Sequence, residues 1–292
     1  MQSAPFPRDE AARHQALIDL HILDSPSEAE FDALVSIAST VCGVPISLVS
    51  LIDRDRQWFK AEVGLPGVSE TSRDVSFCAH AILGDDVFEV NDASRDPRFA
   101  DNPLVVHDPH IRFYAGAPLR LGNGLQVGTL CVIDRQPRQL DPAQRQALAQ
   151  LARTTVRLLE DRQALQWLAE REKRWRVLCD LSPAPLGLCD PRGRLWFANP
   201  AWATWWGAPE PHAADDTWLD RLAPEDRAAA QAAWTRLQQD RQPFELVVRS
   251  AASGRTARLR AQVDQVGATV AGALLTLVTE AAEPGLTAPP SA

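Results

Sequence analysis

Two stretches near the start of the chain carry apolar residues three or four positions apart. They run from Asp9 to Leu20 and from about Ser27 to Cys42, and each predicts an amphipathic helix. We expect Ser27 to cap the second helix, with Glu30 completing a capping box, and Gly43 to end it.

The pattern then changes to short apolar and β-branched runs, which indicate strands. They fall at 45–53, 57–63, 87–91, 111–120 and 125–134. The first run is uninterrupted, which is typical of a central strand buried on both faces. The second is expected to pair with it in antiparallel fashion. Between them and the later strands, "SFCAHAILG" (76–84) predicts a short helix closed by glycine.

A long helix is predicted next, beginning at Asp141-Pro142 and continuing to about Leu178. Its apolar seam is formed by Leu148, Leu151, Thr155, Leu158, Arg162, Leu165 and Ala169. Such a seam suits coiled-coil pairing, and hence a homodimer through 141–178, although Arg162 interrupts it. Alternatively, the first half packs on the sheet and the second half is a charged spacer. The two interpretations are compatible.

The remaining sequence predicts a second α+β module. Two strands joined by Asp-Pro-Arg-Gly precede a helix that Asn199 caps, and a further helix fits 224–240. Three strand-like runs follow. We therefore expect an α/β (α+β) fold with two modules, each an antiparallel sheet flanked by helices. The boundaries are 1–162 and 176–280, with a helical linker at 163–175 and a disordered tail at 281–292.

Composition narrows the functional classes. A length of 292 residues fits about two domains, and the formal net charge of −8 argues against nucleic acid as a partner. The five cysteines are widely spaced and contain no C-x-x-C pair, so neither a disulfide framework nor a zinc ribbon is indicated. No apolar run reaches membrane-spanning length. We expect a reduced, cytoplasmic protein without a membrane partner.

Residues 8–162 resemble a GAF domain of bacterial signalling proteins. The resemblance is carried by "ILDSPSEAEFDALVSIA", "PISLVSLIDRDRQWFKAEVGL", "SFCAHAI", "DPRFADNPLV", "FYAGAPL" and "GTLCVIDRQPRQLDPAQ". Residues 175–279 resemble a PAS domain through "GRLWFANPAW", "APEDRAAAQAAW", "QPFELVVR" and "LLTLVTE". The resemblance implies two sensory modules with small-molecule pockets, which dimerise through helices and pass a conformational bias to an output.

The expected function is therefore a cytosolic sensor that binds a small molecule and signals to a downstream protein. No GGDEF, EAL, phosphate-loop or helix-turn-helix pattern is present, so a complete chain of this sequence would act through a partner. A fragment of a longer protein would look the same. The alternatives are the sensory part of a histidine kinase of a two-component system or of a diguanylate cyclase, a GAF-based thiol or methionine-sulfoxide reductase, and an interaction module with packed cores.

Cys78 and His80 are the most chemically suggestive pair. In a helix, residues two positions apart point to nearly opposite sides, so the two side chains do not form a catalytic dyad. Packing in the core is the favoured interpretation for Cys78. A role in a pocket wall, or as a thiol activated at a helix N-terminus, remains open. No catalytic residue is assigned.

The strand 111–120 points to a pocket. If Phe113 and its apolar alternates face the helices, Arg112 and Tyr114 face the other side. The resemblance places a ligand there, under the loop 91–106, and these two side chains suit a polar or anionic ligand. A solvated face with an Arg–Asp pair is the alternative. The expected GAF pocket residues are Trp58, Phe77, Cys78, His80, Asp92, Phe99, Arg112, Tyr114 and Cys131.

In the PAS-like half, the expected pocket residues are Asn199, Trp202 and Trp206. Trp202, Trp205 and Trp206 form an aromatic stripe, for which core packing is favoured over a ligand wall. Neither a metal nor a cofactor is required by the sequence. Haem is disfavoured for want of a strong histidine candidate. Bilin is disfavoured because Ala79 separates Cys78 from the histidine, and flavin because the Asn-Cys-Arg motif of photosensors is missing.

Overall fold

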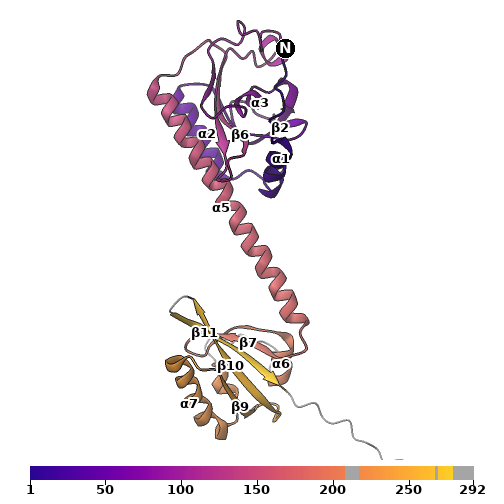
Figure 1. Cartoon of the computed structure of the whole chain (residues 1–292), viewed down its shortest axis with the longest axis vertical. Helices are drawn as coiled ribbons and strands as arrows, with labels where there is room; N and C mark the ends of the chain where they lie inside the picture. Colours follow the sequence, from indigo (N-terminus) through magenta and orange to yellow (C-terminus); the bar gives the residue numbers. More distant parts are fainter. Residues whose placement is uncertain (208–216, 267–268, 279–292) are drawn as a thin grey trace, which may run out of the picture. The chain divides into compact units, whose positions relative to one another are not determined.

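The computed structural model describes residues 1–207, 217–266 and 269–278. The chain divides into two compact units, Met1–Ala169 and Glu170–Ala292, and helix α5 (Pro142–Leu181) is continuous across the boundary (Figure 1). Each unit is an antiparallel sheet flanked by helices, so the predicted α+β fold is confirmed. The tail expected at 281–292 lies outside the described residues.

The sheet of the first unit has the strand order β3-β2-β1-β6-β5-β4, and all its pairs are antiparallel. The strands are β1 (Ile46–Ile52), β2 (Arg56–Val63), β3 (Glu70–Ser72), β4 (Phe88–Val90), β5 (Phe113–Arg120) and β6 (Gln126–Asp134). Every residue of β1 is buried, as its uninterrupted apolar run predicts. The predicted pairing of the first two strands is confirmed.

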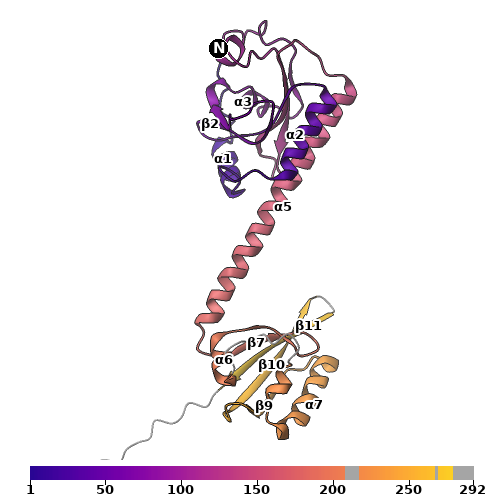
Figure 2. The same cartoon turned by 180° about the vertical axis from the view of Figure 1, so that it is seen from behind.

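Three helices cover one face of this sheet. They are α1 (Glu10–Asp19), α2 (Ala29–Cys42) and the first half of α5, and α2 and α5 lie side by side (Figures 1 and 2). Gly43 ends α2 at a left-handed φ of 64°, as predicted. The predicted capping box is wrong, because Glu28 occupies the N-cap. The Ser27 hydroxyl instead donates to Asp32 at 2.7 Å.

The opposite face carries a second apolar core under shorter elements. These are the 3-10 turn η1 (Arg73–Val75), α3 (Phe77–Ala81) and α4 (Pro103–Val106). Strand β5 alternates as predicted, with Phe113 and Ala115 in the first core and Tyr114 in the second. The solvated-face alternative is wrong for Tyr114, which is completely buried.

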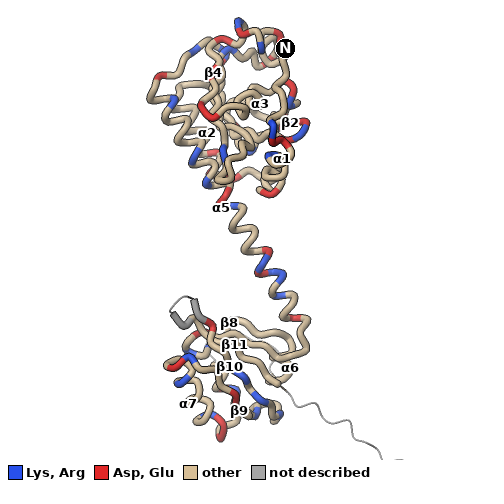
Figure 3. Tube along the Cα trace, in the orientation of Figure 1, with Lys and Arg blue, Asp and Glu red and all other residues tan. Residues whose placement is uncertain are grey.

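Helix α5 changes character along its length. Leu148, Ala152, Val156 and Leu159 belong to the core on the first sheet, and Thr155 is also buried. Beyond Arg162 the helix exposes apolar side chains, with Leu165 68% and Leu168 59% exposed. Lys and Arg are interspersed with Asp and Glu farther along (Figure 3). The first half therefore packs on its own domain, as one interpretation of the seam predicts.

The sheet of the second unit has the order β8-β7-β11-β10-β9. Its elements are β7 (Leu186–Cys189), β8 (Leu195–Ala198), α6 (Pro200–Trp206), η2 (Trp218–Arg221), α7 (Pro224–Asp240), β9 (Phe244–Arg249), β10 (Thr256–Val266) and β11 (Thr269–Val278). Residues of α6 and α7 form its core together with the sheet. Asn199 caps α6 with Pro200 in the first turn, as predicted. In the described part of the chain, no helix is both long and apolar enough to cross a membrane.

Candidate functional site

A cavity of about 130 Å³ lies between α3 and the second face of the GAF-like sheet. Phe77, Cys78 and Tyr114 line it, all three of them expected from the sequence. Val68 and Asp108 also border the cavity and are exposed, which places its mouth between the β2–β3 connection and the segment after α4. Most of the wall is apolar, so the cavity suits a small, largely apolar occupant.

The Cys78 thiol makes polar contacts inside a core that is otherwise apolar. The Tyr114 hydroxyl donates to its sulfur at 3.3 Å, and the Cys131 sulfur lies 3.8 Å away. Burial raises the pKa of the Cys78 thiol, but interactions with Cys131, Ser50, Thr129 and Tyr114 outweigh burial and lower the pKa to about 6.

Local sequence positions this sulfur. The Ser76 hydroxyl oxygen accepts from the Ala79 N–H at 3.0 Å and so caps α3, which holds Cys78 in its first turn. Gly116 provides the space for Tyr114, because a Cβ there would lie 2.1 Å from the Tyr114 hydroxyl oxygen. A side chain at 116 would therefore displace the phenol from the sulfur.

The remaining expected residues of the GAF pocket do not line this cavity. Trp58 packs in the core on the opposite face of the sheet. Phe99 stacks on Phe77 with ring centroids 4.1 Å apart and so backs the wall. Cys131 lies behind Cys78. The position of each of these three residues depends on the face of the sheet to which its side chain points. The sequence spacing did not predict that face for Trp58.

His80, Asp92 and Arg112 are also engaged elsewhere. The Nε2 atom of His80 lies 3.0 Å from the Gln2 carbonyl oxygen, so His80 does not meet Cys78, as the helical spacing predicts. Asp92 accepts from the Ser94 hydroxyl and N–H, closing a turn. The Arg112 guanidinium donates to the carbonyls of Val105 and Ile111 at 2.9 and 3.0 Å, not to an aspartate.

Sequence reasoning missed the larger part of the wall. The missed residues are Leu48, Gln57, Phe59, Leu65, Val68, Thr71, Leu104, Asp108, Pro109, Ile111 and Ile133. Apolar strand residues give no signal that separates a cavity wall from a packed core. Ser50 could have indicated a polar feature in this core, because its hydroxyl lies inside a run predicted to be buried on both faces.

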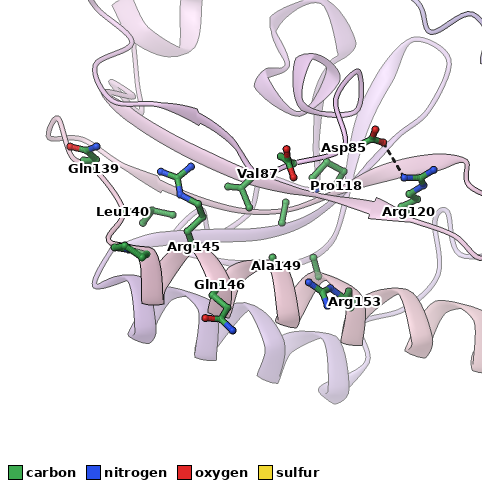
Figure 4. A pocket seen from close by; sticks show the side chains of 14 residues that line it. Asp85, Val87, Pro118, Arg120, Gln139, Leu140, Arg145, Gln146, Ala149 and Arg153 are labelled. Carbon is green, nitrogen blue, oxygen red and sulfur yellow. Dashed lines mark hydrogen bonds and ion pairs between the residues drawn. The ribbon is translucent and has the colours of Figure 1, made fainter.

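A second hollow of about 880 Å³ lies between the β4–β5 region and the start of α5 (Figure 4). Arg120, Arg145 and Arg153 contribute to its lining. The Arg120 guanidinium pairs with Asp85 at 3.1 Å, and Arg145 pairs with Glu89. Two of the three basic groups are thus neutralised by neighbouring carboxylates, which weakens the hollow as an anion site.

A partly buried ion-pair network on the helix side of the sheet anchors α5. Lys60 follows the wall residue Phe59, and its completely buried ammonium donates to Glu28 at 2.7 Å. Arg162 of α5 donates to the same carboxylate oxygen at 2.9 Å and to the His21 carbonyl at 2.9 Å. Burial opposes ionisation of Glu28, but the two cations outweigh it and lower its pKa. This explains why arginine interrupts the apolar seam.

Strand β2 contains a β-bulge at Lys60. Phe59 pairs with Ser50 and Ala61 with Val49, so Lys60 is the extra residue without a partner on β1. Adjacent residues of a strand point to opposite faces of the sheet, and Phe59 and Lys60 do so. Here Phe59 lies in the cavity-side core while the Lys60 ammonium lies 5.4 Å from the ring centre of Phe31, in the helix-side core.

In the second unit, the Asn199 amide is occupied by the protein itself. Its oxygen accepts from the N–H groups of Leu186 and Trp202, both at 2.9 Å. Its nitrogen donates to the carbonyls of Cys179 and Ala184 at 3.0 and 2.8 Å. Asn199 therefore ties the end of α5 to β7 and α6.

The tryptophans of α6 form part of the core. Trp202 and Trp206 are completely buried, with ring centroids 5.6 Å apart, and Trp205 packs edge-on against Trp206. All three belong to the apolar core of the second unit, which agrees with the favoured interpretation. Within 1–207, 217–266 and 269–278, no group of three or more His, Cys, Asp or Glu side chains is arranged to hold a metal ion.

Comparison with known families identifies both modules. A model of the GAF domain matches residues 26–157, and a model of the PAS fold matches residues 179–278. The chain therefore contains a GAF domain followed by a PAS domain, as the sequence motifs predict. These domains make it a signal-transduction sensor in the broad sense.

One curated relative is the cyclic di-GMP phosphodiesterase PA2567 of Pseudomonas aeruginosa, which is 49% identical over 138 residues. The match covers 47% of this chain and only 23% of the relative. Among solved structures, the Escherichia coli DhaR(N)–DhaL complex matches with a TM-score of 0.59 at 14% identity, over 96% of this chain and 93% of that one. The latter likeness shows the fold alone.

Proposed function

We propose that this chain is a cytoplasmic sensor whose GAF domain binds a small molecule in the α3 cavity and relays occupancy through α5. The observation that carries the proposal is the adjacency of Phe59 and Lys60. Phe59 lines the cavity, and Lys60 holds the carboxylate to which Arg162 of α5 is also bound. A change in the wall that shifts β2 therefore acts on the anchor of the helix.

The wall chemistry supports a small neutral ligand. Leucine, isoleucine, valine and phenylalanine side chains dominate it, and the Tyr114 hydroxyl and the Gln57 amide are among its few polar groups. Arg112, which suggested an anionic ligand from sequence, is bound to backbone carbonyls and lies outside the wall. The proposed ligand class changes accordingly from anionic to largely apolar with one or two polar atoms.

The relay is proposed to run through a homodimer. Beyond Arg162, α5 exposes Leu165, Trp167 and Leu168, and exposed apolar side chains along a helix favour pairing with a second copy. The segment 163–175 then acts as the linker between domains. Ligand binding shifts the population between two packings of the paired helices, and a downstream protein reads the difference.

The relative suggests what the sensor controls. PA2567 is named as a cyclic di-GMP phosphodiesterase, and this chain matches less than a quarter of it. We therefore propose that the GAF–PAS pair described here regulates an enzyme of cyclic di-GMP turnover, in cis or in trans. We assign no catalytic residue for that turnover within the described residues.

The test compares two substitutions on the same short helix. Leu104→Trp fills the cavity, whereas Val106→Trp adds the same bulk at an exposed position outside its wall. Native mass spectrometry of the full chain, with an absorption spectrum, measures the dimer mass and any copurifying molecule. We expect an adduct on wild type and on Val106→Trp, but not on Leu104→Trp. An adduct retained by Leu104→Trp would place the ligand elsewhere.

A further inference from the structure

Two cysteines meet in the cavity-side core although 53 residues separate them in sequence. The Cys78 sulfur on α3 lies 3.8 Å from the Cys131 sulfur on β6, and both are free thiols. A disulfide has an S–S length of about 2 Å, so a bond requires the sulfurs to approach by roughly 2 Å.

The Cys78 sulfur accepts one hydrogen bond from a hydroxyl group, and two further hydroxyls are buried on β1 and β6. Tyr114 donates to it directly, and Ser50 and Thr129 lie opposite each other in the β1–β6 register. Both of these residues are completely buried, and their hydroxyls have no hydrogen-bond partner within the described residues. A buried hydroxyl without a partner is costly. The hydrogen bond from Tyr114 and the polar side chains of Ser50 and Thr129 favour a negative sulfur at Cys78.

The cavity reaches only one of the two sulfurs. Cys78 lines it, whereas Cys131 lies behind Cys78 and is absent from its wall. A small molecule that enters past Val68 and Asp108 therefore meets Cys78 first. Cys131 is then placed to react with a modified Cys78, not with the incoming molecule.

We propose that Cys78 and Cys131 form a reversible disulfide when a small hydroperoxide enters the α3 cavity. In the first step the Cys78 thiolate attacks one peroxide oxygen, an S–O bond forms, and the O–O bond breaks. The departing alkoxide or hydroxide takes up the proton that Cys78 released. The sulfur is now a sulfenic acid, and the peroxide has been reduced to an alcohol or water.

In the second step the Cys131 sulfur attacks the Cys78 sulfur. The S–S bond forms, the S–O bond breaks, and the hydroxide leaves as water with the Cys131 proton. In sum, two thiols and one hydroperoxide give one disulfide, one alcohol or water, and one water. A cellular dithiol reverses the reaction by thiol–disulfide exchange. This redox site goes beyond ligand sensing and does not depend on it.

The other buried cysteines of the chain provide internal controls. Burial raises the pKa of the Cys42 thiol to about 11 and that of Cys189 to about 12, and neither faces a second cysteine. Their thiolate fractions at neutral pH are correspondingly small. In the native wild-type protein, Cys78 is therefore expected to oxidise at least about tenfold faster than Cys42 or Cys189.

The test treats the folded full chain with hydrogen peroxide, blocks the remaining thiols after denaturation, and identifies cross-linked peptides by mass spectrometry. We expect a linkage between 78 and 131 before any modification of Cys42 or Cys189, and its removal by dithiothreitol. Absence of this linkage in folded protein, or equal oxidation rates at all three sites, overturns the proposal. This comparison uses the wild type, so it does not depend on variants that fold poorly.

Variants separate the two steps. Cys131→Ser should stop the reaction at a Cys78 sulfenic acid that dimedone traps, whereas Cys78→Ser should leave Cys131 unreacted. Cys42→Ser is the matched control and should behave as wild type. Tyr114→Phe removes one donor and should slow Cys78 oxidation about tenfold. Trapping at Cys131 in Cys78→Ser would reverse the assigned order and refute the proposed geometry.

Discussion

Replacing Glu28 by glutamine tests the anchor of α5 most directly. The Lys60 side chain is completely buried, and its ammonium donates to the Ser25 hydroxyl at 2.9 Å, the Pro26 carbonyl at 2.5 Å and Glu28 at 2.7 Å. The substitution keeps the shape of the side chain and removes the negative charge. Lys60 then remains buried without an opposite charge.

The expected cost follows from this geometry. Removing one partner of a fully buried ion pair costs about 3–5 kcal/mol. Glu28 is 33% exposed, and the Lys60 ammonium keeps two neutral hydrogen-bond acceptors. We therefore expect Glu28→Gln to lower the free energy of unfolding by about 2 kcal/mol. Lys60→Met removes the buried charge, so no charge is left without a partner, and the free energy of unfolding should fall by about 1 kcal/mol or less.

The assay is urea unfolding followed by hydrogen exchange in peptides of residues 1–162, which reports the GAF domain separately from the PAS domain. Glu30→Gln is the matched control, since Glu30 is exposed two residues away on α2. We also expect faster exchange around Arg162 in Glu28→Gln. The reasoning is refuted if Glu28→Gln and Glu30→Gln have equal unfolding free energies, or if Lys60→Met is the more damaging change.

Three further outcomes are expected. Burial opposes ionisation of Glu10, but hydrogen bonds from two arginines lower its pKa from 4.5 to about 2. Its stabilisation is complete above pH 4.5 and is lost toward pH 2, so unfolding free energies of wild type and Glu10→Gln should converge over that window. Gly116→Ala should displace Tyr114, slow Cys78 alkylation and lower the melting temperature. Asn199→Ala should destabilise the PAS domain by about 2 kcal/mol in urea unfolding followed by exchange, whereas Asn91→Ala, at an exposed position of the GAF domain, should not.

Local patterns predicted most of the architecture. The uninterrupted run of β1, the alternation in β5 and the glycine after α2 each depend on residues close in sequence, and each prediction is confirmed. The predicted capping box is wrong because the Ser27 hydroxyl donates to Asp32. The helix therefore begins one residue later than the sequence pattern predicts.

The candidate site was less predictable because it depends on contacts between distant segments. No spacing rule brings Cys131 to Cys78 across 53 residues. Arg162 looked like a defect in an apolar seam, and only its contact with Glu28 shows it to be an anchor. The cavity wall consists largely of apolar strand residues, whose sequence pattern is the same whether they enclose a space or fill one.

The neighbouring positions of Phe59 and Lys60 on β2 have a consequence for how such a sensor diversifies. Because adjacent residues place the wall and the anchor on opposite faces of one strand, wall side chains can be exchanged without removing the groups that form the ion pairs. We therefore expect ligand preference and helix attachment to vary independently. Homologous domains that detect other molecules should differ at Phe59 and Ile133 while retaining lysine, glutamate and arginine at 60, 28 and 162.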